Sequence, residues 1–191
     1  MNASKVAWRR TLAAAAACLI TLHCSSLAVG PAWQTRSLLS NAAFERGLDG
    51  WRFEAWKDKV AKAVPDPQVP HSGRPSIRVD HPEVTDSSLT QIVKVKPNTR
   101  YRLSGWIKTH NVVKPELGYQ RPGKEGASLG IVGGYEKSPS VTGTQNWTLV
   151  SMDFDSKSRT SVRIGPRLGH YGKKVTGTAW FADISLVELG R

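Results

Sequence analysis

Short runs of alternating apolar and polar residues follow one another along the chain from Ser37 onward. The alternation is clearest over Tyr101–Thr109 and recurs in Thr148–Phe154 and Ser161–Gly165. A period of two residues is typical of strands with one buried face. Gly, Pro, Asn and Asp separate the runs. The expected strands are Ser37–Ser40, Trp51–Trp56, Ser76–Asp80, Leu89–Val95, Tyr101–Thr109, Ser128–Gly133, Thr148–Phe154, Ser161–Gly165 and Ala179–Glu188.

Many short strands joined by turns predict an all-β protein, either an antiparallel β-sandwich or a barrel. Three longer connections interrupt the pattern, at Lys57–Arg74, Asn111–Ala127 and Pro166–Thr178. Within the first, Lys57–Val64 is compatible with one helical turn. Long loops on a small rigid scaffold are where binding tends to reside.

The last expected strand, Ala179–Glu188, contains an irregularity. Ala179 and Phe181 share one face, whereas Ile184 and Leu186 lie in the opposite register. One extra residue near Ala182 or Asp183 would return both sets to the same core, which is what a β-bulge does. Asp183 then lies where the backbone bends, either capping nearby N–H groups or binding calcium.

Three segments together resemble a known family. They are Thr176–Glu188, reading TGTAWFADISLVE; Leu38–Glu45 followed by Gly50-Trp51; and Gln91–Lys108. In this order and spacing they are similar to carbohydrate-binding modules of the family four, nine and twenty-two type, over about Ser37 to Val187. The resemblance implies a two-sheet jelly roll of the galactose-binding-domain-like class, spanning 37–188, and carbohydrate as ligand.

The first 28 residues predict a secretory signal peptide, followed by a short linker over 29–36. Lys5, Arg9 and Arg10 precede an apolar run at Thr11–Leu22, which is short for a membrane span, and a small-residue cleavage signal ends at Ala28. We expect the mature chain to be secreted, periplasmic or at the cell surface, without membrane insertion.

Both cysteines, Cys18 and Cys24, lie in this leader, so a mature chain from residue 29 has none and cannot depend on disulfides. Lipidation at Cys24 is the alternative to cleavage, although His23 stands where such signals want a small residue.

The chain of 191 residues carries a net charge of +12, and removal of the leader with its three positive charges leaves +9. A basic exported domain suggests an anionic partner such as an acidic glycan, although a soluble surface that is simply basic explains the charge equally well. No nucleic-acid-binding motif accompanies the charge, so we expect no nucleic-acid partner.

Sugar recognition uses exposed aromatic faces surrounded by polar groups. Tyr101, Phe154 and Phe181 lie in the apolar register and are expected in the core, as is Trp51. Trp106 lies in the opposite, polar register and is the leading stacking candidate. The other binding candidates are Trp56, Tyr119, Tyr135 and Tyr171 at strand ends or in loops, with Arg163 and Arg167 for hydroxyls or carboxylates. For any one aromatic, a partly buried structural role is the alternative.

The resemblance also implies a structural calcium ion that bridges the first and last strands. The positions carried over are Glu45 and Asp183. Relatives often have a second acid where this chain has Ala182, so a metal-free pair of Glu45 and Asp183 is the alternative.

Sequence signals for catalysis are weak. Asp80, Glu83 and Asp86 surround His81, but the segment reads as a solvated, proline-containing turn. We therefore predict an exported β-sandwich that binds a poly- or oligosaccharide without transforming it. A jelly roll that contacts protein is the alternative from another class, followed by a polysaccharide-cleaving enzyme.

Overall fold

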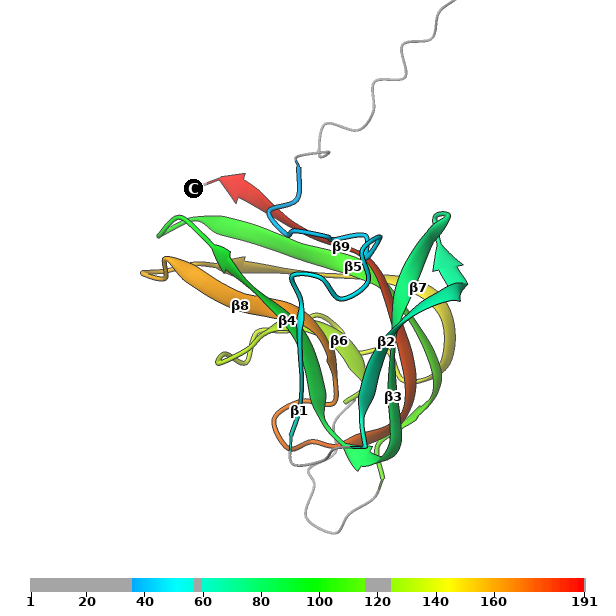
Figure 1. The fold of residues 1–191 in the computed structure, drawn as a ribbon. Helices are drawn as coiled ribbons and strands as arrows, with labels where there is room; N and C mark the ends of the chain where they lie inside the picture. The colour runs from blue at the N-terminus through cyan, green and yellow to red at the C-terminus, as the bar shows by residue number, and fades with distance from the viewer. Residues whose placement is uncertain (1–35, 57–59, 116–124, 191) are drawn as a thin grey trace, which may run out of the picture. The chain divides into compact units, whose positions relative to one another are not determined.

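The computed structural model describes residues 36–56, 60–115 and 125–190, which form an antiparallel β-sandwich (Figure 1). The expected signal peptide, the expected linker up to residue 35 and Tyr119 lie outside the described residues. The strands are β1 (Arg52–Ala55), β2 (Lys62–His71), β3 (Arg74–Thr85), β4 (Ser87–Lys94), β5 (Arg100–Val113), β6 (Ala127–Ile131), β7 (Gly143–Asp155), β8 (Ser161–Leu168) and β9 (Val175–Gly190). No helix in the described ranges is long or apolar enough to cross a bilayer.

The strands divide into two sheets. The four-stranded sheet has the order β1-β4-β8-β6 and the five-stranded sheet the order β2-β3-β9-β5-β7. Neighbouring strands in both sheets pair antiparallel, which confirms the predicted all-β, two-sheet class. The central pair β5 and β9 are the longest strands (Figure 1).

The core lies between the sheets and follows the alternation in the sequence. Tyr101, Phe154 and Phe181 are all buried there, and Trp51 is 8% exposed, as expected. Tyr101 stacks on Phe154 with ring centroids 5.7 Å apart, and its hydroxyl oxygen accepts a hydrogen bond from the Lys96 amide at 2.9 Å. An aromatic pair of this kind adds stabilisation beyond its buried area.

The predicted bulge in β9 is confirmed. The register of β5 against β9 shifts between Ser104 and Trp106, and Asp183 has φ of 48°. The extra residue returns Ile184 and Leu186 to the core face that Phe181 already occupies, and all three are buried. The bend lets one continuous strand contribute both sets of apolar side chains.

The opening segment is not a strand. Residues 37–40 form bends and turns, but the Leu38 amide donates to the Leu186 carbonyl at 2.8 Å and the Ile184 amide to the Ala42 carbonyl at 3.0 Å. The segment therefore satisfies backbone groups of β9 without joining its ladder. Phe44 is fully buried beneath the Trp51 ring, with centroids 5.1 Å apart.

The largest error of the sequence prediction is at β2, which was expected as a connection with one helical turn. Lys62–His71 instead pairs with β3 and forms one edge of the five-stranded sheet. Pro65, Pro67 and Pro70 interrupt the strand signal, and proline is tolerated in strands chiefly at edges. The edge position explains why a proline-rich segment is nevertheless extended.

Candidate functional site

A pocket of about 830 Å³ opens on the outer side of the four-stranded sheet. Four of the predicted binding residues line it together: Trp56, Arg163, Arg167 and Tyr171. The remaining lining residues are Glu54, Ala55, Asp86, Ser88, Val132, Gly133 and Gly172. The pocket therefore combines residues from β1, β4, β8 and the segments that follow β1, β6 and β8.

The alternation of β8 positions the two arginines. Val162 and Ile164 point into the core and are buried, so Arg163 lies on the outer face of the sheet. The Arg163 Nη1 atom lies 3.1 Å from Glu54 Oε2, while Arg52 Nη2 lies 3.0 Å from Glu54 Oε1. Two guanidinium groups thus hold one carboxylate at the pocket wall and fix its position.

Arg167 is far more buried than its neighbour. The residue is 4% exposed, and its guanidinium carbon lies 4.5 Å from the centre of the Tyr171 ring. The nearest carboxylate is Asp86, whose Oδ1 is 3.9 Å from Arg167 Nη2. Among the described residues, Nε and Nη1 of Arg167 have no hydrogen-bond partner. Buried guanidinium groups are normally hydrogen-bonded on several sides, so this arrangement is incomplete.

Tyr171 is held from both sides. Its hydroxyl oxygen accepts a hydrogen bond from the Gly133 amide at 2.5 Å, and its ring meets the edge of His170 at 4.5 Å. Tyr135, another predicted binding residue, packs against Tyr171 at 5.8 Å and is itself 87% exposed. The ring of Tyr171 is therefore fixed between the pocket and an exposed aromatic at its rim.

Charged groups surround His170, the residue before Tyr171. Burial, and then the positive charge of Arg167, lower the pKa of His170 to about 4, so its imidazole is neutral at pH 7. Glu125 is 6% exposed and bonds Lys173 at 2.9 Å, with Lys137 at 3.6 Å. Burial opposes ionisation of Glu125, but the hydrogen bond from Lys173 and the charges of Lys137 and Lys173 outweigh it and lower the Glu125 pKa.

The leading candidate, Trp106, lies on the other sheet. It is half-buried on the outer face of β5, and the His71 imidazole stacks against it with centroids 4.5 Å apart. Trp147 meets the same imidazole at 5.0 Å. The end of the β2–β3 hairpin therefore covers part of the Trp106 ring with a side chain of the chain itself. Its role in binding stays a prediction.

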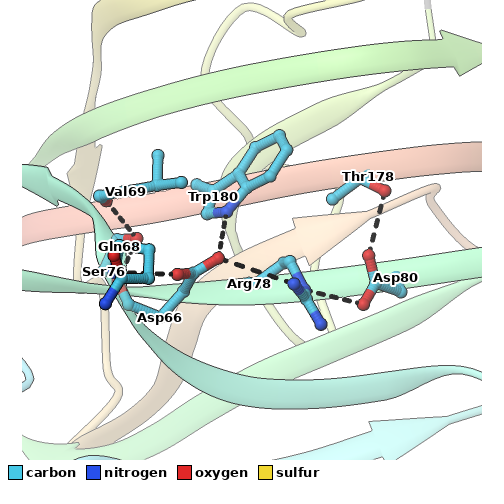
Figure 2. A network of polar contacts seen from close by, with 8 residues as sticks. All are labelled: Asp66, Gln68, Val69, Ser76, Arg78, Asp80, Thr178 and Trp180. Carbon is cyan, nitrogen blue, oxygen red and sulfur yellow. Dashed lines mark hydrogen bonds and ion pairs between the residues drawn. The ribbon is translucent and has the colours of Figure 1, made fainter.

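Trp180 shares that outer face and belongs to a polar network that spans β2, β3 and β9 (Figure 2). Its indole Nε1 donates to Asp66 Oδ2 at 2.9 Å, and Arg78 Nε bonds Asp80 Oδ2 at 2.9 Å. Figure 2 shows the network continuing to Thr178, whose hydroxyl donates to Asp80 at 2.9 Å. Both acids are thus hydrogen-bonded by side chains of the same sheet, which favours a structural role for this network.

The side chains at the two expected calcium positions do not fit the ion. Asp183 accepts a hydrogen bond from His71 Nδ1 at 2.7 Å and lies 3.2 Å from Arg74 Nη2. Glu45 is exposed. Within the described ranges, no group of three or more His, Cys, Asp or Glu side chains is placed to hold a metal ion. Calcium prefers several oxygen ligands, and Asp183 is already bound by His71 and Arg74.

The segment around His81 was expected as a solvated turn, and that expectation is wrong. His81 lies in β3 and is 2% exposed, with Nε2 2.7 Å from the Ser87 hydroxyl and Nδ1 3.2 Å from the Val175 carbonyl. Asp86 follows the strand, is 6% exposed and lines the pocket. The prolines and acids of the segment obscured a long strand that pairs with β9.

The sequence profile of the family named "Carbohydrate binding domain" (CBM_4_9) matches residues 36–164, more than half of the chain. This chain belongs to that carbohydrate-binding domain family. The matched range includes β1, β4, β6 and Arg163 of β8, and it ends just before Arg167.

Solved structures of carbohydrate-binding modules share the fold. A family 61 module, TmCBM61, solved with β-1,4-galactotriose, has a TM-score of 0.53 and 19% identity, covering 81% of this chain and 99% of that one. A family 16 module has a TM-score of 0.53 and 20% identity, with 80% and 100% covered. At these identities the likeness shows the jelly-roll fold alone.

Curated relatives match a similar region. The tRNA nuclease WapA of Bacillus subtilis is 27% identical over 158 residues, and a WapA of Bacillus spizizenii is also 27% identical over 158 residues. Each alignment covers 78% of this chain but only 7% of the relative. The likeness therefore concerns one small part of a much larger protein.

Proposed function

We propose that this chain is an exported, non-catalytic domain that binds a poly- or oligosaccharide in the pocket on the four-stranded sheet. The observation that carries the proposal is the meeting of exposed Trp56 and fixed Tyr171 with Arg163 and Glu54 in one hollow. Trp56 is 66% exposed and Tyr171 43%. Ligand sites in proteins combine such apolar surfaces with a few oriented polar groups.

The acids of the pocket support binding over catalysis. Glu54 is held by Arg52 and Arg163, and Asp86 accepts the Gly172 amide at 2.7 Å and lies beside Arg167. A glycoside hydrolase needs one carboxyl group that keeps its proton near neutral pH. Both carboxylates are bound by other groups of the chain itself, so neither is placed as a free proton donor to a substrate.

Export and partner follow from the sequence. The basic and apolar run ahead of Ala28 supports secretion to the periplasm, cell surface or medium, and the net charge of +9 that remains without residues 1–28 supports a glycan with negative charge. The nuclease activity named for WapA belongs to proteins of which this chain resembles only a small part, and the proposal assigns no such activity here.

A comparison of two tryptophan variants tests the site. Trp56→Ala should weaken binding to the glycans retained by the wild-type chain by about tenfold or more, because stacking area at the pocket is lost. Its thermal midpoint should stay close to that of the wild type, since Trp56 is 66% exposed. Glycan-array screening followed by titration calorimetry measures the affinities.

Trp106→Ala is the matched control from the opposite sheet. It should retain glycan binding within about twofold, because His71 already covers its ring. Loss of binding in Trp106→Ala together with full binding in Trp56→Ala would move the site to the five-stranded sheet. Failure of the wild-type chain to retain any glycan would refute carbohydrate binding.

A further inference from the structure

Arg167 carries a buried charge that the protein itself leaves incompletely paired. The side chain is 5% exposed, and in the described part of the chain neither Nε nor Nη1 has a hydrogen-bond partner. A buried cation without full pairing is costly, and replacing it by a neutral residue often stabilises a protein. A charge retained in this state at a pocket wall indicates a ligand that completes its coordination.

Asp86 does not supply the missing contacts. Its Oδ1 is 3.9 Å from Arg167 Nη2, beyond hydrogen-bond distance, and its Oδ2 accepts the Gly172 amide at 2.7 Å. Glu54 is bound by two other arginines, and Glu125 by Lys173 and Lys137. Each of these three acids thus has a closer partner than Arg167.

The guanidinium is held ready for a planar anion. It lies against the ring of Tyr171 at 4.5 Å, and the hydrogen bond from Gly133 fixes that ring. A guanidinium group is planar, and its fork of N–H groups matches the two oxygens of a carboxylate. Little conformational freedom remains to be lost on binding.

We infer that Arg167 recognises the carboxylate of an acidic sugar, so that the pocket selects uronic-acid-containing glycans over neutral ones. The inference rests on the proposed carbohydrate binding and specifies its ligand class. The sugar ring packs on the exposed face of Trp56, and its carboxylate meets Arg167 at the Tyr171 wall. Arg163 remains bound to Glu54 and contacts hydroxyl groups.

The test compares uronate oligosaccharides with their neutral forms. Trimers of galacturonic, mannuronic and glucuronic acid are titrated beside the methyl ester of each, using the full chain. At least one acid should bind about tenfold tighter than its ester, the scale of a hydrogen bond to a charged group. The preference should shrink as salt concentration rises.

Arg167→Gln should abolish the preference for the acid while leaving affinity for the ester within about threefold. Arg100→Gln is the control for net charge, because Arg100 is exposed on the five-stranded sheet and away from the pocket. Arg167→Lys, which keeps the charge without the planar fork, should retain only part of the preference. Thermal unfolding of each variant establishes that it is folded.

Three results would overturn the inference. If Arg167→Gln keeps the preference for the acid, that preference comes from the general positive charge of the surface and not from Arg167. If the wild-type chain binds acid and ester equally, the carboxylate is not recognised, although carbohydrate binding itself stands. A preference for sulfated over carboxylated trimers would show that the carboxylate is not the anion that the pocket selects. Absence of binding to every sugar would instead refute the underlying function.

Discussion

His81 lies inside the sandwich with both ring nitrogens engaged by neutral groups. The contacts suit one tautomer, in which Nδ1–H donates to the Val175 carbonyl and Nε2 accepts the Ser87 hydroxyl. Burial lowers the His81 pKa below its usual value, despite hydrogen bonding to Val175 that raises it. The pKa of His170 is lowered to about 4, first by burial and then by Arg167.

These two imidazoles make the free energy of unfolding depend on pH. Both folded-state pKa values lie below the ordinary value of 6.5, so the unfolded chain binds protons that the folded chain refuses. Their contribution is complete above about pH 6.5 and is lost as pH falls through each folded-state pKa value, which for His170 is about 4. We expect the free energy of unfolding to decrease over this window, by up to about 3 kcal/mol from His170 and in the same direction from His81. Urea titrations at pH 7.5, 6, 5 and 4 measure it.

His170→Gln should flatten this pH dependence, because the variant removes one proton-binding group from the unfolded chain. His110→Gln, which removes an exposed imidazole at the end of β5, is the matched control and should retain the wild-type slope. A pH profile that is identical in all three chains would contradict the assignment to His170.

Single-residue predictions succeeded where alternation alone decides orientation. The core positions of Tyr101, Phe154 and Phe181 follow from a period of two. The burial of Arg167 did not follow, because Arg167 shares a register with Arg163 and only the fold around Tyr171 and Asp86 separates them. Long-range packing of that kind leaves no periodic signal in the sequence.

At the scale of elements, β9 organises both the five-stranded sheet and the opening segment. It pairs with β3 and β5, and it also bonds the chain at Leu38 and Ala42. The bulge at Asp183 is required for this arrangement, because it decides which face of the sheet the side chains after it point to. The change of parity between Phe181 and Ile184 revealed it in the sequence.

Deletion of Ala182 should therefore be severely destabilising. Removing one residue rotates Ile184 and Leu186 from the core to the outer face, or forces a slip against β5. Loss of two buried side chains predicts a fall of at least about 4 kcal/mol in unfolding free energy. Deletion of Leu189, beyond the last core residue, should cost far less, and guanidinium titration compares them. Near-equal losses would show that the bulge does not set the register.

Strand β2 shows where prediction of an element from its sequence fails. Three prolines in β2 weakened the strand signal, and only the pairing partner in β3 makes the extended conformation favourable. Propensity arguments treat a segment in isolation, whereas an edge strand is stabilised by its neighbour.

For the whole molecule, the side chains predict stability that does not depend on calcium. His71 and Arg74 satisfy Asp183, and Glu45 is exposed. Addition of calcium or of a chelator should shift the thermal midpoint by less than about 2 °C. A larger, saturable rise with calcium would restore the metal site implied by the family resemblance, and Asp183→Asn would then identify its ligand.

The two-sheet architecture was predictable because strand number, turn spacing and family motifs all agreed. The location of the pocket was not, since it depends on which outer face remains open. On the five-stranded sheet His71 lies over Trp106, whereas on the four-stranded sheet Trp56 stays exposed. The alternation in the sequence favoured Trp106 over Trp56, and only the folded structure shows that His71 lies against the first while the second stays exposed.

The strand order also gives the five-stranded sheet two dissimilar margins. At the β2 edge, Pro65, Pro67 and Pro70 cannot donate backbone hydrogen bonds, so a strand of another molecule cannot pair continuously there. At the β7 margin, Gly143–Asp155 has no proline. Self-association in concentrated solution would then begin along β7, and a single lysine or proline introduced on that strand would suppress it.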